Sequence, residues 1–139
     1  MPLTPTPQQQ GVIEHTEGPL LVIAGPGAGK TFTLVERIVY LVADKGVPPE
    51  QILVGTFTEK AASELITRIA HRLLSRNIVV NIDEMYIGTI HSICLRLLEE
   101  HREFTRLKKN FTLMDQFDQV YFFFQRLRKF EDEAPLALL

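Results

Sequence analysis

The 139-residue sequence contains a single cysteine, Cys94, and no tryptophan. One cysteine excludes a disulfide within the chain and is typical of proteins in a reducing compartment, so we expect a cytoplasmic location. With four histidines and no second cysteine, the sequence also lacks the ligand spacing of a zinc site. Apolar residues flank Cys94 at helical spacing, which predicts that its side chain is buried in the core.

Long hydrophobic runs are missing as well. The longest ones, such as residues 20–24, fall far short of the roughly 20 apolar residues that a membrane-spanning helix needs. The N-terminus shows no basic stretch followed by an apolar one, so no signal peptide is expected. We therefore predict no association with a membrane.

The sequence has no excess of basic residues, because its formal net charge is −2 and its pI is near 6.1. Small domains that hold duplex DNA by its phosphates usually have a basic face. Any contact of this chain with nucleic acid must therefore come from local geometry or from surfaces outside the chain.

The hydrophobic pattern predicts alternating strands and helices in a chain whose composition is that of a folded domain. The expected strands are residues 20–24, 52–57 and 85–89, with a further extended segment at 78–82. The expected helices are residues 8–15, 30–44, 59–75, 90–100 and 115–130, the last one capped by Asp115. This order predicts an α/β fold with a parallel sheet, in which residues 20–24 form a strand buried on both faces.

The last expected helix is more apolar than one buried face requires. Phe117, Val120, Phe124 and Leu127 form one face, residues 121–123 are all aromatic, and the final residues 135–139 are apolar too. Folded monomers rarely expose so much contiguous apolar surface, so we expect further polypeptide to cover this region.

The most specific motif is a glycine-rich loop between an expected strand and an expected helix. It reads Ala24-Gly25-Pro26-Gly27-Ala28-Gly29-Lys30-Thr31 and fits the phosphate-loop pattern in the structural setting that this pattern requires. Glycines let successive backbone N–H groups point at one anion, and the helix N-terminus adds partial positive charge. Lys30 is expected to reach the β- and γ-phosphates of ATP, and the Thr31 hydroxyl to bind Mg²⁺, so both are the expected catalytic residues.

Two positions depart from the usual phosphate loop. Ala24 stands where the first glycine is usual, which requires only an ordinary backbone angle there. Pro26 has no N–H group, so we expect the amides of residues 27–31 to be the phosphate donors.

Nearly the whole chain resembles the superfamily 1 DNA helicases of the UvrD/Rep type. Residues 4–12, Thr-Pro-Thr-Pro-Gln-Gln-Gln-Gly-Val, are similar to the family's Q motif, and counting back from Val12 places its adenine-reading glutamine at Gln8. An amide side chain can pair with the N6 donor and the N7 acceptor of adenine. The resemblance implies an incomplete RecA-like motor domain over residues 1–110, followed by the start of a helical inserted subdomain over residues 111–139.

Two further segments are similar to the DNA-contacting motifs of this family. Residues 56–65 resemble motif Ia and residues 88–92 resemble motif Ib, which implies contacts with single-stranded DNA. The implied contact residues are Phe57, Thr58, Thr89, His91 and Ser92. Phe57 offers a face for base stacking, and the others offer donors for phosphates. Glu59 stands where the family usually has asparagine, and a carboxylate repels a phosphate.

The residues that complete ATP hydrolysis in this family are not found in the sequence. The Asp-Glu pair of motif II follows motif Ib in the family, whereas Asp83-Glu84 precedes it and is interpreted as a solvated turn. We therefore expect the N-terminal part of an ATP-dependent DNA helicase of DNA repair, moving 3′ to 5′, which binds nucleotide weakly and hydrolyses it negligibly by itself. Its implied partners are DNA and the remainder of the helicase chain, including the second motor domain.

Three other interpretations remain open. A helicase–nuclease subunit of the RecB or AddA kind shares these motifs and differs by a nuclease domain outside the chain. A small nucleotide kinase would need lid arginines, which the turns near residues 56 and 89 do not supply. A non-catalytic nucleotide-binding interaction module would not need the intact pair Lys30 and Thr31.

Overall fold

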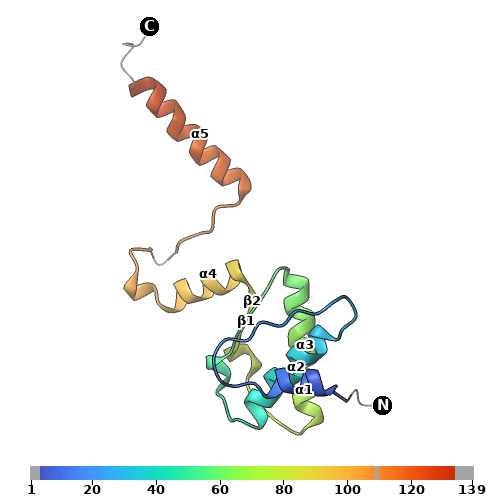
Figure 1. Cartoon of the computed structure of the whole chain (residues 1–139). Coiled ribbons are helices and arrows are strands. Elements are labelled where there is room, and N and C mark those ends of the chain that lie inside the picture. Colours follow the sequence, from blue (N-terminus) through green and yellow to red (C-terminus); the bar gives the residue numbers. More distant parts are fainter. Residues whose placement is uncertain (1–3, 109, 134–139) are drawn as a thin grey trace. The chain divides into compact units, whose positions relative to one another are not determined.

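The computed structural model describes residues 4–108 and 110–133 (Figure 1). The helices are α1 (Pro7–Glu14), α2 (Lys30–Ala43), α3 (Glu59–Ser75), α4 (Ile90–Glu100) and α5 (Gln116–Glu133). The strands are β1 (Leu53–Thr56) and β2 (Tyr86–Thr89), and the short 3₁₀ helices are η1 (Pro49–Gln51), η2 (Ile82–Glu84) and η3 (Arg102–Phe104). The α/β class predicted from the sequence is confirmed, and α3 and α4 have the predicted bounds.

The chain forms two compact units, of which one ends at Glu100 and the other begins at His101. This division lies before residue 111, where the sequence predicts the start of the helical subdomain, and that functional boundary stays a prediction.

The sheet of the first unit consists of β1 and β2, which are parallel and connected through α3. Gly55 pairs with Gly88, and Thr56 pairs with Thr89. Because the carboxyl ends of parallel strands meet at one edge, α3 and α4 both begin at this edge. The glycine pair makes room for α4, since a Cβ atom at Gly88 would lie 2.4 Å from Ser92 Oγ and one at Gly55 would lie 3.1 Å from Ile90 Cδ1.

The hydrophobic core lies where α2 and α3 pack together with the segments around the sheet (Figure 1). Apolar residues three and four positions apart give each helix one buried face. The buried members are Val35, Ile38, Val39, Val42, Ile52, Leu65, Ile69, Leu73 and Met85.

Two ion pairs connect α2 and its C-terminal end with α3. Glu36 Oε1 lies 2.6 Å from Arg72 Nε, and Asp44 Oδ1 lies 2.8 Å from Arg76 Nη2. The hydrogen bonds from Arg76 lower the pKa of the Asp44 carboxyl group.

Residues 20–24 correct one prediction, because they are not a strand and are not buried. Leu21 is 86% exposed and Ile23 is 90% exposed. An extended apolar segment becomes a buried strand only when neighbouring strands take its backbone hydrogen bonds and helices cover its faces. Among the described residues, the sheet contains only β1 and β2, so this segment has no strand beside it.

The structure confirms the predicted turn at Asp83 and Glu84 but corrects the prediction for Cys94. Asp83 and Glu84 lie in η2 and are exposed, which confirms that they form a turn. Cys94 is exposed, so the prediction of a core cysteine is wrong. The buried position of α4 is its neighbour Ile93, because the helix turns by about 100° per residue and presents only a narrow face to the sheet.

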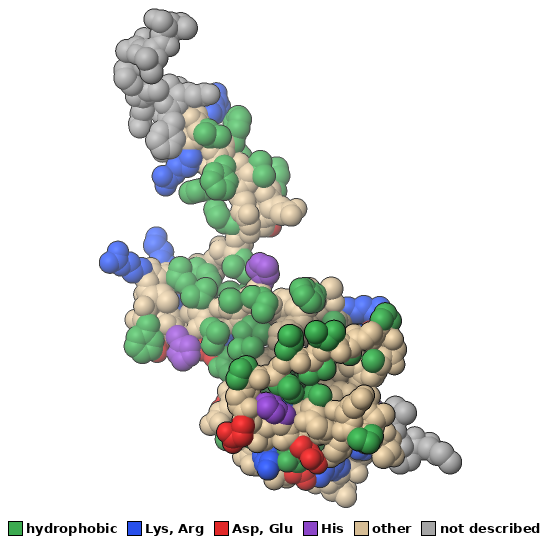
Figure 2. Space-filling view, viewed as in Figure 1, with side chains coloured by type: hydrophobic (Ala, Val, Ile, Leu, Met, Phe, Trp, Pro, Cys, Tyr) green, Lys and Arg blue, Asp and Glu red, His purple; other side chains and the backbone are tan. Residues whose placement is uncertain are grey.

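The second unit contains α5, whose N-terminus is capped as predicted by Asp115 Oδ1, which accepts a hydrogen bond of 2.7 Å from the Asp118 amide. Apolar side chains lie exposed along this helix (Figure 2), among them Phe117 and Val120. The polypeptide expected to cover them stays a prediction. No helix in residues 4–108 and 110–133 is long and apolar enough to cross a membrane.

Candidate nucleotide-binding loop and DNA-contact edge

The glycine-rich loop turns sharply into α2 through residues with left-handed backbone angles. Gly27 has φ 74° and Gly29, the N-cap of α2, has φ 77°. These angles are costly for residues with a Cβ atom, so both positions require glycine. The Thr33 amide donates to the Gly29 carbonyl at 2.9 Å, which begins the hydrogen-bond ladder of the helix. The amides of residues 30–32 therefore have no partner inside the helix and suit an anion.

One of the predicted phosphate donors is engaged within the loop. The Ala28 amide donates to the Gly25 carbonyl at 3.4 Å, which is a long and weak hydrogen bond. The loop amides of residues 27–31 remain the predicted donors, with that of Ala28 requiring a small rotation.

Lys30 folds back over the loop that precedes it. Its Nζ donates to the Ala24 carbonyl at 3.1 Å and to the Gly25 carbonyl at 2.8 Å. The ammonium group thus lies at the loop itself, and Thr31 is exposed at the next position of the helix. This arrangement places a cation and unpaired amides around one loop.

A cavity of about 670 Å³ lies between the loop, α1 and α2. Its volume falls in the usual range of small-molecule sites. The predicted site residues Gln8, Ala24, Ala28 and Lys30 line it together. The structure therefore brings the predicted adenine-reading residue and the phosphate loop to the same cavity.

Gln9 contacts the phosphate loop directly, although the sequence analysis did not single it out. Its Nε2 donates to the Ala28 carbonyl at 3.1 Å, and its Oε1 accepts from the Thr6 amide at 2.9 Å. The second contact belongs to a capping box at the N-terminus of α1. The pattern Thr-x-x-Gln at residues 6–9 was the signal for that box.

Arg37 is a second residue that sequence reasoning missed. Its Nη1 donates to the carbonyls of Val12 at 2.6 Å and Ile13 at 3.4 Å, so α2 caps the last turn of α1. Arg37 also lines the cavity. The signal in the sequence that could have pointed to Arg37 was a single arginine between Val35 and Ile38 in an otherwise apolar helix.

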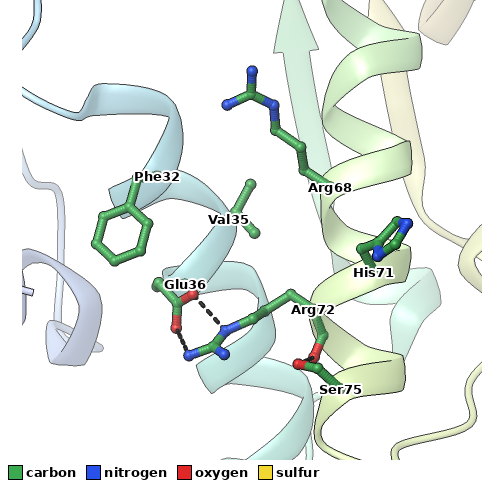
Figure 3. Close-up of a pocket in the computed structure, with 7 residues that line it drawn as sticks. All are labelled: Phe32, Val35, Glu36, Arg68, His71, Arg72 and Ser75. Carbon is green, nitrogen blue, oxygen red and sulfur yellow. Dashed lines mark hydrogen bonds and ion pairs between the residues drawn. The ribbon is translucent and has the colours of Figure 1, made fainter. Parts of the chain in front are cut away.

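A second cavity, of about 340 Å³, lies between α2 and α3 (Figure 3). It contains none of the predicted site residues. Glu36 and Arg72 pair with each other across the gap, since Glu36 Oε2 accepts from Arg72 Nη2 at 3.0 Å in addition to the 2.6 Å contact between Glu36 Oε1 and Arg72 Nε. We therefore assign no binding role to it.

The carboxyl edge of β1 and β2 brings the two predicted DNA-contact segments together. Thr89 Oγ1 donates to Glu59 Oε1 at 2.8 Å and lies 3.0 Å from Ser92 Oγ. Thr58 caps α3, because its Oγ1 accepts from the Ala61 amide at 3.1 Å. The hydroxyl groups at this edge thus make local hydrogen bonds, and the Glu59 carboxylate joins the two segments.

The remaining two predicted DNA-contact residues are exposed at the same edge. Phe57, two residues before α3, is 103% exposed, and His91 in the first turn of α4 is exposed as well. A fully exposed aromatic ring such as that of Phe57 is available for stacking on a base.

The profile of the UvrD/REP helicase N-terminal domain matches residues 5–137. The chain belongs to this family. It is 41% identical over 114 residues to the ATP-dependent DNA helicase PcrA of Bacillus subtilis strain 168, which covers 82% of the chain and 15% of that protein. PcrA of Staphylococcus epidermidis is 40% identical over 112 residues, and PcrA of Staphylococcus aureus is 38% identical over 112 residues, each covering 81% of the chain and 15% of the relative. The chain thus spans about 15% of the length of these relatives.

In this member of the UvrD/REP family, the described residues contain no group of three or more His, Cys, Asp or Glu side chains that could hold a metal ion. Thr31 stays the predicted protein ligand of a magnesium ion, and the phosphates of a nucleotide would supply further oxygen ligands.

Proposed function

We propose that the chain is the ATP-binding N-terminal part of an ATP-dependent DNA helicase. The observation that carries this proposal is the loop in which Gly29 caps α2 in a left-handed conformation and Lys30 lines a cavity of about 670 Å³. The names of its PcrA relatives support DNA unwinding as the purpose of ATP use.

Different residues of the proposed site have different roles. The amides of residues 27–31 and the Lys30 ammonium bind the phosphates, and Gln8 reads the adenine edge. The Thr31 hydroxyl holds Mg²⁺, which neutralises the charge of the phosphates when it is bound. The carboxylates that activate water come from the remainder of the parent helicase, so the chain alone hydrolyses ATP negligibly.

The DNA strand is proposed to lie along the carboxyl edge of β1 and β2. Phe57 stacks on a base, while Thr58, Thr89, His91 and Ser92 contact phosphates at the starts of α3 and α4. We propose 3′ to 5′ movement, a role in DNA repair and a cytoplasmic location for the parent protein, and we place the start of its helical subdomain at residue 111.

Titration calorimetry with ADP and Mg²⁺ tests the nucleotide site. We expect Lys30→Ala to weaken ADP binding by about 10-fold or more, which corresponds to roughly 1.4 kcal/mol. Lys45→Ala is the matched control, because Lys45 lies after the C-terminal end of α2, with its Nζ 5.5 Å from the Tyr40 ring centroid. Equal ADP affinities for the wild type and Lys30→Ala would contradict the proposal.

A further inference from the structure

We infer that Glu59 is an internal competitor of the DNA strand, because its carboxylate takes a hydrogen bond that a DNA phosphate needs at the carboxyl edge of β1 and β2. The inference rests on the proposed DNA contact at this edge and adds to it a residue that opposes binding. A strand that contacts both predicted segments, residues 56–65 and 88–92, must first displace this carboxylate.

Two helices begin at this edge of the sheet. The paired strands β1 and β2 end in register, α3 begins at Glu59, and α4 begins at Ile90. The first hydrogen bond of the α3 ladder runs from the Ala62 amide to the Thr58 carbonyl at 3.1 Å, so the amides of residues 59 and 60 have no partner inside the helix. Unpaired amides and the helix dipole favour a negative charge at such a place.

The Glu59 carboxylate supplies a negative charge at this edge. Its Oε1 accepts from Thr89 Oγ1 at 2.8 Å, across 30 residues of sequence. It forms no ion pair with any residue that the structure describes. Carboxylate and phosphate oxygens carry the same sign of charge and accept the same kinds of hydrogen bond, so both fit the same donors.

The contact uses the proton that Thr89 would otherwise offer to a phosphate. A threonine hydroxyl group has one proton to donate, and Thr89 donates it to Glu59 while its oxygen accepts from the Ser92 amide at 3.2 Å. Ser92 Oγ lies 3.0 Å from the Thr89 carbonyl oxygen and 3.0 Å from Thr89 Oγ1, so its proton also has acceptors within the protein. Removing the Glu59 carboxylate therefore frees the Thr89 proton for a ligand.

Simple repulsion between Glu59 and the DNA phosphates is the alternative, and Thr89 separates the two explanations. Repulsion depends on charge and distance, so removing the carboxylate should raise DNA affinity by the same factor with or without a hydroxyl group at residue 89. Competition requires the freed hydroxyl group, so the gain should shrink in the Thr89→Val background. Repulsion between exposed charges also fades as salt is added, whereas a freed donor stays available.

The experiment is fluorescence anisotropy of a labelled oligothymidine with the chain, for Glu59→Ala, Thr89→Val and the double variant. At low salt, we expect Glu59→Ala to raise the affinity about 10-fold in the wild-type background and about 3-fold in the Thr89→Val background. Glu59→Gln keeps an acceptor for Thr89 and removes only the charge, so its gain should be about 3-fold. Glu64→Ala is the matched control, because Glu64 is an exposed glutamate of the same helix.

A salt series of the wild type and Glu59→Ala gives a second measurement that does not depend on the Thr89 variant. We expect a gain of about 3-fold to remain at about 0.3 M salt, where the Debye length is much shorter than at low salt. Circular dichroism of each variant verifies the fold, which alanine at the first position of a helix and valine in place of threonine should preserve.

Three results would overturn the inference. Equal gains from Glu59→Ala in both backgrounds, or a gain that vanishes with salt, would leave repulsion as the explanation while the DNA edge stands. A lower affinity of Glu59→Ala would show that the carboxylate supports the edge instead of competing there. If neither Thr89→Val nor Phe57→Ala weakens oligothymidine binding, the proposed DNA edge itself fails, and the inference fails with it.

Discussion

Two parts of the first unit have the same plan in the sequence, an apolar segment followed by a turn and a helix, yet they differ in the structure. Residues 53–56 form β1, pair with β2 and lead into α3. Residues 20–24 lead into the phosphate loop and α2, but they stay unpaired and exposed. The comparison teaches that the loop and the helix depend on local sequence, whereas a strand depends on its neighbours.

The largest expected difference is in the free energy of unfolding, when an isoleucine is shortened to alanine in the helix after β1 and in residues 20–24. Ile69 in α3 is fully buried, so Ile69→Ala should lower the free energy of unfolding by about 2–5 kcal/mol. Ile23 is 90% exposed, so Ile23→Ala should change it by no more than about 0.5 kcal/mol. Urea unfolding followed by circular dichroism measures both. Similar losses for the two variants would mean that residues 20–24 are packed in solution.

The substitution Gly88→Ala should weaken the packing of α4 against the paired strands and lower the stability of the fold. The added Cβ atom would lie 2.4 Å from Ser92 Oγ, so α4 must shift away from the sheet, at an expected cost of about 1–3 kcal/mol in unfolding free energy. Gly11→Ala is the control, because no atom lies within 4 Å of the added Cβ and its position in α1 favours alanine. Thermal unfolding of both variants tests this, and an unchanged transition for Gly88→Ala would refute the close packing.

Removing the Glu59 charge should raise the affinity for DNA at the proposed contact edge of β1 and β2. Glu59→Gln keeps an oxygen that accepts from Thr89 Oγ1 and removes the repulsion of a DNA phosphate. We expect the affinity for a fluorescent oligothymidine at low salt to rise about 3-fold, as measured by anisotropy. Glu64→Gln, an exposed position on the same helix, should have a smaller effect. Equal gains from both variants would indicate a general charge effect instead.

The smallest expected effect concerns the ion pair that joins α2 and α3. Because Arg76 lowers the pKa of Asp44 in the folded state, the pair stabilises the fold above the unfolded pKa of about 3.9. That contribution is lost as the pH falls through the folded pKa. Both side chains are more than a third exposed, so it should stay below about 1 kcal/mol. The stability difference between the wild type and Asp44→Asn should shrink as the pH falls below about 5 and through the lowered folded pKa, and a constant difference would contradict this.

The sequence predicted the elements whose signals are local. The bounds of α3 follow from the Thr58 cap and from apolar residues at three- and four-residue spacing, and the phosphate loop follows from its glycines. The unpaired state of residues 20–24 was not predictable, because it depends on which other strands are present. The exposure of Cys94 depends on the small face that α4 buries.

The contacts between distant segments of the site were also beyond sequence reasoning. Gln9 meets the loop across 19 residues, and Glu59 meets Thr89 across 30 residues. All four residues lie in recognised motifs, but the motifs do not say which side chains meet, because both contacts are set by where the turns come to lie in space. The residue types in the loop were predictable, whereas the side chain that supports the loop was not.

The position of the Lys30 ammonium has a consequence for which anions the proposed phosphate site would favour. Its hydrogen bonds to the carbonyls of Ala24 and Gly25 already occupy part of the hydrogen-bonding capacity of the ammonium group. An incoming anion must exchange these bonds for its own, which a chloride ion with a single contact does poorly. A chain of phosphates offers several oxygens to the ammonium and the amides at once, so the exchange favours multivalent ligands over the monovalent salt of the cell.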